Sequence, residues 1–180
     1  MKRMFAVSLI TGLVLWSSLA FAAEDVVSAV RGTIQKIDAS TRSVVVRAAD
    51  GTEHTVHVGA GAAVHGTKIA AQGTFRGLKE GTDVVVHYTR KGTRETALEV
   101  DTVGKGGLKT LEGTISELDR ATKKLVVRTA DGTKETFALT RHATADAGKD
   151  IASQTEKATK VTVYYTEQAG HKTAHFFEHL

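Results

Sequence analysis

Short segments in which apolar and polar residues alternate make up most of the chain after its first two dozen residues. Alternation with a period of two is typical of half-buried β-strands, and the β-branched residues Val and Thr are frequent in these segments. A Lys-Gly or Ala-Gly pair follows the fourth strand of each half and predicts a hairpin into a fifth strand. We expect a nearly all-β protein with at most a minor helix, and strands at residues 30–37, 43–48, 52–58, 84–89, 111–118, 124–129, 133–139, 161–166 and 171–177.

The strand pattern occurs twice along the chain. Residues 32–58 align without gaps with residues 113–139, and 13 of the 27 aligned positions are identical. Residues 83–97 align in the same way with residues 160–174. The identical residues are mostly Gly, Thr, Asp and Val at expected turn and core positions, so the duplication indicates two copies of one fold.

Each copy is predicted to contain three strands, a connection and two more strands. We expect the connections, residues 59–82 and 140–159, to be irregular, although residues 147–159 have a helical composition. Between the second and third strands each copy has an Asp-Gly pair, Asp50-Gly51 or Asp131-Gly132, flanked by alternating apolar residues. This pair predicts a tight hairpin with a type I′ turn, because both residue types tolerate positive φ.

The strand order is that of an OB-like barrel, in which a helix can lie between strands three and four. The pattern G-T-I-x-x-[IL]-D, [VL]-V-V-R, A-D-G-T, L-K-x-G and V-x-V-x-Y-T resembles small exported bacterial β-barrel domains that form a family of unknown function. More distantly, it resembles the periplasmic copper chaperone of metal-efflux systems. The resemblance covers both copies and implies two tandem five-stranded OB-like barrels, residues 23–103 and 111–180, joined by a linker at residues 104–110.

The first residues have the pattern of a signal peptide. A basic start, MKRM, is followed by an apolar run and by Ala20-Phe21-Ala22, which supplies small residues at the positions a signal peptidase reads. We expect cleavage after Ala22, which makes residues 1–22 a signal peptide. The remaining chain is then predicted to be periplasmic or secreted, with no stable membrane span.

Composition excludes several classes of partner and cofactor. The formal net charge is only +4, and the basic residues are interspersed with acidic ones, so no nucleic-acid partner is predicted. The chain has no cysteine, which excludes disulfides and thiolate ligands. Met1, Met4 and Trp16 are its only Met and Trp residues, and all lie in the predicted signal peptide. The copper-chaperone resemblance implies Met, His and Trp ligands for monovalent copper, so the mature chain is not expected to bind that ion.

The chain has eight histidines, but no histidine of one copy aligns with a histidine of the other. The only regular series is His171, His175 and His179, spaced four apart. On a helix this spacing would stack three rings over one ion, whereas on the expected strand adjacent members are about 13 Å apart. We therefore predict no metal and no cofactor, with these three histidines as the alternative site.

No catalytic motif is present. The aspartates that both copies share occupy expected turns, and the sequence contains no nucleophile elbow, zinc-protease motif or phosphate-binding loop. The sequence favours a non-catalytic exported binding or accessory protein of the bacterial cell envelope, with an envelope protein or glycan as its partner. The alternative is a periplasmic protein that binds a divalent metal through histidines, and an enzyme is the least supported class.

Overall fold

The computed structural model describes residues 27–66, 71–72, 75, 77–146 and 159–180. The predicted signal peptide, residues 1–22, and residues 147–158 of the segment with helical composition lie outside this part of the chain. The elements of the described part are β1 (Val27–Asp38), β2 (Ser43–Ala48), β3 (Glu53–His65), β4 (Ala71–Gln72), β5 (Asp83–Lys91), β6 (Arg94–Thr102), β7 (Lys109–Asp119), β8 (Lys124–Arg128), β9 (Lys134–Leu139), α1 (Arg141–Asp146), β10 (Lys160–Gln168) and β11 (His171–His179). The prediction of a nearly all-β protein is confirmed.

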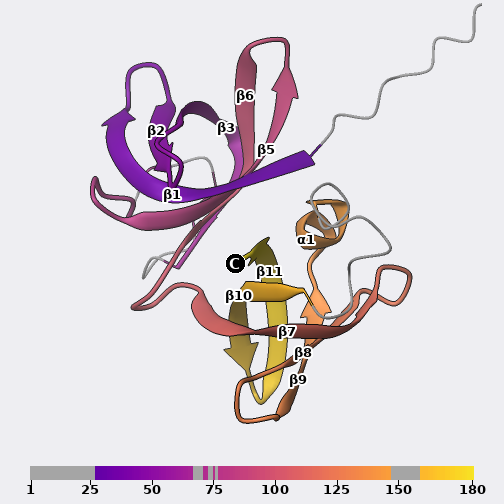
Figure 1. Ribbon diagram of the computed structural model, residues 1–180. Helices are drawn as coiled ribbons and strands as arrows, with labels where there is room; N and C mark the ends of the chain where they lie inside the picture. The colour runs from indigo at the N-terminus through magenta and orange to yellow at the C-terminus, as the bar shows by residue number, and fades with distance from the viewer. Residues whose placement is uncertain (1–26, 67–70, 73–74, 76, 147–158) are drawn as a thin grey trace, which may run out of the picture.

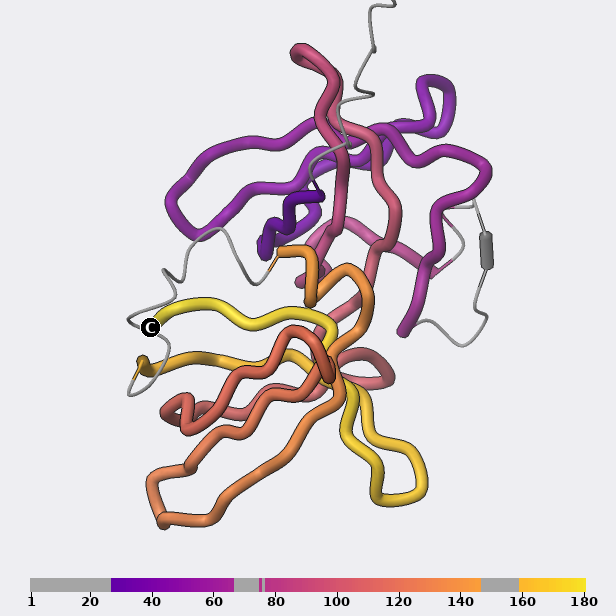
Figure 2. Tube along the Cα trace, turned by 90° about the vertical axis from the view of Figure 1, so that its right-hand side faces the viewer, coloured from indigo at the N-terminus to yellow at the C-terminus, as the bar shows by residue number. Residues whose placement is uncertain are grey.

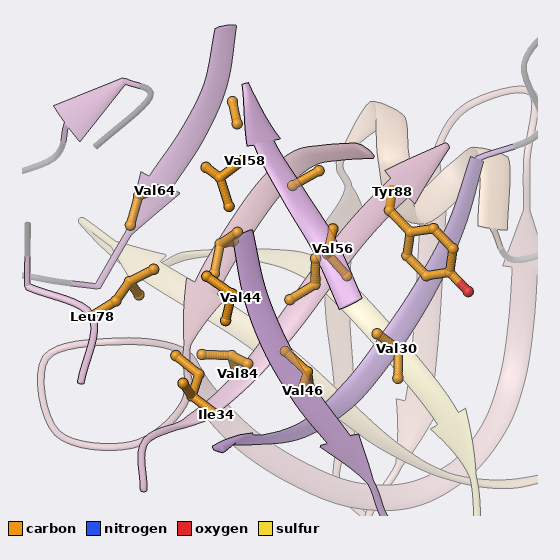
Figure 3. Packing of buried hydrophobic residues seen from close by; sticks show 14 residues of the cluster. Val30, Ile34, Val44, Val46, Val56, Val58, Val64, Leu78, Val84 and Tyr88 are labelled. Carbon is orange, nitrogen blue, oxygen red and sulfur yellow. The ribbon is translucent and has the colours of Figure 1, made fainter. Parts of the chain in front are cut away.

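The first repeat, β1 to β6, forms a six-stranded sheet in the order β2-β1-β5-β6-β3-β4, and β2 also pairs with β3. The β3–β6 pair is parallel, whereas the other pairs are antiparallel. The inward-facing side chains form a core rich in valine, in which Val46 and Val84 are fully buried (Figure 3). The strongly curved sheet encloses this core (Figure 1).

The second repeat, β7 to β11, is a closed barrel in the order β10-β11-β9-β8-β7. Four of the five strand pairs are antiparallel, and the short parallel pairing of β9 with β11 closes the barrel. Phe137, Leu125 and Tyr165 lie in the core of this barrel, and the rings of Phe137 and Tyr165 meet edge to face at 5.2 Å. The closed barrel predicted for this half of the chain is confirmed.

The strand ladders of the two repeats contain bulges at matching places. The β1–β2 ladder skips Gln35 and the β7–β8 ladder skips Ser116. The β5–β6 ladder skips Leu98, and the β10–β11 ladder skips His175. A bulge adds one residue to a strand. After the bulge, the alternation of side chains between the two faces of the sheet is therefore shifted by one residue. The bulge in β6 therefore decides which of its side chains face the core.

The two Asp-Gly hairpins are present, but they are not type I′ turns. Gly51 and Gly132 have φ of 87° and 86°, whereas neither aspartate has positive φ. The N–H of Gly51 donates to the carbonyl of Ala48 at 3.0 Å. The third residue of the loop thus takes the left-handed conformation, which is the geometry of a type I turn followed by a glycine bulge.

Strand β3 is longer than the alternation predicts. It continues from Glu53 through the glycine-containing stretch at residues 59–61 to His65, and its pairing with β6 shifts register between Val58 and Ala63. The extension brings His65 next to the end of β6. This part of the first connection is therefore an ordered strand and not an irregular loop.

The two repeats pack against each other through the outer faces of β5–β6 and β10–β11 (Figures 1 and 2). Val85, Leu108, Tyr164 and Phe176 form a separate hydrophobic cluster at this contact. Helix α1 contacts both β1 of the first repeat and β11 of the second. Within the described residues, no helix is both long enough and apolar enough to cross a membrane.

Candidate metal centre

Polar residues occupy the outer face of the first repeat where it meets the second. The β6 bulge at Leu98 leaves Ala97 and Val100 both in the core, so Glu99 and Asp101 point outward from the sheet. In the ladders Asp101 is the neighbour of His65 on β3, and Glu99 is the neighbour of His87 on β5. Side chains at paired positions lie on the same face, so each carboxylate has a histidine beside it.

The second repeat adds two histidines to this face. His142 lies in the first turn of α1, whose start is fixed because Thr140 Oγ1 accepts the N–H of Ala143 at 3.0 Å. His175 is the bulged residue of β11, between Ala174 in the core and Phe176 at the contact between repeats. We call the following six residues the inter-repeat cluster: His65, His87, Glu99, Asp101, His142 and His175.

His65, Glu99 and Asp101 form the tightest group in the inter-repeat cluster. The Nδ1–H of His65 donates to Asp101 Oδ1 at 2.9 Å, and the same nitrogen is 3.0 Å from Glu99 Oε1. One donor atom from each residue lies within 4.8 Å of the other two. Asp101 is 1% exposed and Glu99 is 9% exposed, whereas 44% of the His65 side chain is exposed and gives a route from solvent.

The histidines of the second repeat approach the same two carboxylates. His175 Nδ1 is 3.5 Å from Glu99 Oε1 and 3.5 Å from Asp101 Oδ2. His142 Nδ1–H donates to the other oxygen of Glu99, Oε2, at 2.7 Å. Glu99 therefore directs one oxygen to His65 and His175 and the other to His142.

Three buried side-chain atoms of the inter-repeat cluster make no hydrogen bond. These atoms are Asp101 Oδ2, His175 Nδ1 and His87 Nδ1. Asp101 Oδ2 and His175 Nδ1 are 3.5 Å apart, which is an ion-pair distance but longer than a normal hydrogen bond. Buried polar atoms are nearly always satisfied in folded proteins, so a group of three in one place calls for an explanation such as a bound ion.

The carboxylates and the histidines shift each other's titration. The hydrogen bond to Asp101 raises the pKa of His65, although partial burial opposes it. Burial lowers the pKa of His175, but the nearby Asp101 and Glu99 carboxylates outweigh it and raise that pKa to about 9. Burial likewise opposes ionisation of Glu99, yet His175 and His142 hold its pKa low, at about 2. For His87 burial dominates and lowers the pKa, so this ring is neutral at pH 7.

The spacing of these atoms also fits the coordination shell of a metal ion. Nitrogen and oxygen ligands about 2.0–2.2 Å from a divalent ion are roughly 3.0–3.5 Å from one another in octahedral or tetrahedral geometry. The separations of His65 Nδ1 and His175 Nδ1 from the carboxylate oxygens, 2.9 to 3.5 Å, fall close to this range. An ion would replace the protons that the histidines now share with the carboxylates.

The histidine series of the sequence does not come together as one site. His171 and His179 lie at opposite ends of β11, as the predicted strand requires, and pair with Gln168 and Val161. Only His175 joins the inter-repeat cluster. The structure thus combines the middle member of the series with residues from β3, β5, β6 and α1.

A second histidine–carboxylate contact lies away from the inter-repeat cluster. His54 Nδ1 is 3.2 Å from Glu95, which also pairs with Arg90. In the second repeat, Glu135 and Lys172 form an ion pair at the positions that align with His54 and Glu95. Since the acidic and basic positions are exchanged and the contact is kept, this pair is interpreted as a link between the two strands in each repeat and not as a repeated binding site.

The aspartates that both repeats share are explained by turns. Asp38 accepts the backbone N–H groups of Ser40 and Thr41, and Asp119 does the same for Ala121 and Thr122. The hydrogen bonds from Ser40 and Thr41 lower the pKa of Asp38 to about 2. These carboxylates hold the chain reversals, and the structure brings none of them into the inter-repeat cluster.

The comparison with families of known proteins gives no further guide to the inter-repeat cluster. No protein-family model matches the sequence, and no curated protein matches it significantly.

Proposed function

We propose that this protein binds a divalent transition-metal ion between its two repeats. His65, Glu99 and Asp101 would be ligands, and His175 would approach from the second repeat. The observation that carries the proposal is the convergence of their donor atoms, together with the buried Asp101 Oδ2 and His175 Nδ1 that have no hydrogen-bond partner. A coordinated ion would satisfy both atoms at once.

The donor set indicates the class of ion. Imidazole nitrogens favour zinc, nickel, copper and iron, whereas sites made only of oxygen favour magnesium, calcium or manganese. The inter-repeat cluster combines both donor types, and the chain contains no cysteine that could favour monovalent copper. We therefore expect a divalent ion of the series Co²⁺, Ni²⁺, Cu²⁺ and Zn²⁺, and expect neither Ca²⁺ nor Cu⁺ to bind tightly.

The competing interpretation is a buried ion-pair network that only holds the repeats together. His65 and His175, when protonated, would balance the charges of Glu99 and Asp101, so charge alone does not separate the two interpretations. A network built for packing would be expected to satisfy all its buried atoms. The atoms without partners in the inter-repeat cluster favour metal binding.

The proposal places metal binding in an exported, non-catalytic accessory protein of the cell envelope. It also assigns an OB-like barrel to both repeats. For the first repeat this assignment is supported by the additional β2–β3 pairing, which joins five strands in the same cyclic order as the closed barrel of the second repeat. Short β4 would then be an addition to the edge of β3.

Calorimetric titration of the tag-free protein with Zn²⁺ at pH 7.5 tests the proposal. The wild-type protein should bind zinc, and His65→Gln or Asp101→Asn should weaken binding at least about 10-fold, which is the lower end of the effect of losing a group that merely orients a ligand. His171→Gln, on the same strand as His175 but outside the inter-repeat cluster, is the matched control and should bind like wild type. Equal binding by all four proteins, or no binding by wild type, would contradict the proposal.

A further inference from the structure

His87 has the surroundings of a metal ligand although it lies outside the tightest group. Its side chain is fully buried, and its Nε2–H donates to the backbone carbonyl of His175 at 2.9 Å. This bond fixes the tautomer, so Nδ1 carries a lone pair, and that atom has no hydrogen-bond partner. Histidines that bind metals commonly donate their other ring nitrogen to a carbonyl or carboxylate in this way.

Two further side chains that can bind a metal ion lie next to His87. Glu99 occupies the paired position on β6, which places the two side chains side by side on one face. His142 packs next to it as well, with its ring centroid 5.5 Å from that of His87. His142 Nδ1 is 2.7 Å from Glu99 Oε2, whereas the contacts of His65 and His175 are to Glu99 Oε1, at 3.0 and 3.5 Å.

The fold itself does not require polar residues at these positions. In the second repeat, the pair just before the matching bulge is Tyr164 with Phe176, where the first repeat has His87 with Glu99. Their rings lie 5.7 Å apart and belong to the hydrophobic cluster between the repeats. An aromatic pair therefore serves the same strand geometry, and His87 with Glu99 needs a reason beyond packing.

We infer that a second divalent ion binds on the other side of Glu99, to His87 Nδ1, His142 and Glu99 Oε2. Glu99 would then bridge two ions, with Oε1 on the ion held by His65 and Asp101. Carboxylate-bridged pairs of ions are typically about 3.5–4 Å apart. The inference rests on the proposed function because the two ions share Glu99.

Both ions would have ligands from both repeats. The first would take His175 of β11, and the second would take His142 of α1, while the carboxylates come from β6. The ion at the second position would again be a transition-metal ion such as zinc or cobalt, because two of the three residues that bind it are histidines.

Stoichiometry separates this inference from the proposed function. Tag-free protein is dialysed against Zn²⁺, and the bound metal is measured by mass spectrometry for wild type, His142→Gln and the control His171→Gln. We expect two zinc ions per chain for wild type and the control, and one for His142→Gln. One ion in all three proteins would overturn the second site and leave the first, whereas no ion in wild type would overturn both.

A spectroscopic measurement on the wild type keeps the inference testable if His142→Gln fails to fold by circular dichroism. Two Co²⁺ ions bridged by one carboxylate couple magnetically, so the spin-resonance signal per cobalt should fall when the second equivalent binds. A signal that doubles from one equivalent to two would show separate ions and overturn the bridge. A titration that saturates at one equivalent would overturn the second site.

Discussion

Replacing Asp101 by asparagine separates the stability of the inter-repeat cluster from its metal affinity. The side chain is 1% exposed, and its Oδ1 accepts the Nδ1–H of His65 at 2.9 Å. Asparagine keeps the shape and one acceptor oxygen but removes the charge. Hydrogen bonds to charged groups contribute about 1.5–3 kcal/mol, so Asp101→Asn should lower the free energy of unfolding by about that amount in the presence of a chelator.

Zinc should widen this difference between the two proteins. A ligand that binds only the folded state at 100 times its dissociation constant stabilises it by about 2.7 kcal/mol. Wild type should gain that increment at the corresponding zinc concentration, whereas Asp101→Asn should gain little because the ion loses a ligand. The difference in unfolding free energy between the proteins should then grow to about 4–6 kcal/mol.

Urea denaturation followed by circular dichroism, with chelator and with zinc, measures both quantities. Asp119→Asn is the matched control, because it removes a carboxylate that holds a turn outside the inter-repeat cluster. In chelator, Asp119→Asn should lower the free energy of unfolding because the turn is weakened. With zinc, it should gain the same stabilisation as wild type. An Asp101→Asn protein that zinc stabilises as much as wild type would refute the role assigned to Asp101.

Three further predictions concern the turns, the close strand contacts and the pH dependence of stability. Gly32→Ala should lower the melting temperature, because the added Cβ would lie 2.2 Å from the carbonyl oxygen of Arg47; an overpacked site of this kind costs about 1–3 kcal/mol, and an unchanged melting curve would contradict the strand contact. Gly51→Val should also lower the melting temperature, because Gly51 has φ of 87° in open space, so strain alone acts; unchanged stability with altered zinc binding would instead place this turn in a site. The third prediction concerns His175 in chelator: burial lowers its pKa, but the Asp101 and Glu99 carboxylates raise it to about 9. The stabilisation from protonated His175 should be fully present below pH 6.5 and lost as the pH rises through about 9. Urea curves at pH 6.5 and 9.5 measure this loss, and a free energy of unfolding that does not fall would contradict a protonated His175.

Alternation along the sequence was sufficient to predict most of the strands. β2 occupies the predicted range 43–48, and β8 and β9 match their predicted ranges within one residue. In contrast, β1 begins three residues before the predicted position 30, and the two-residue β4 was not predicted. The pattern failed where β3 continues through Gly59 and Gly61, since glycine carries no side chain to alternate. That omission left His65 in a predicted loop, so its pairing with Asp101 could not be expected.

The inter-repeat cluster could not be predicted by aligning the repeats. Alignment searches for residues that both copies share, whereas this cluster joins a polar face of the first repeat to α1 and β11 of the second. The spacing of Glu99 and Asp101 on one face of a strand was an available signal, but alternation does not reveal which element covers that face. The position of His175 depends on a bulge that only the β10–β11 register shows.

The central claim, a metal ion held between the repeats, is tested most directly by locating the ion. Crystals of the zinc-loaded, tag-free protein, measured on both sides of the zinc absorption edge, place zinc independently of the rest of the density. The account predicts an anomalous peak within bonding distance, about 2.0–2.2 Å, of His65, Glu99 and Asp101. A peak at His171 or His179 instead, or no peak between the repeats, would contradict it.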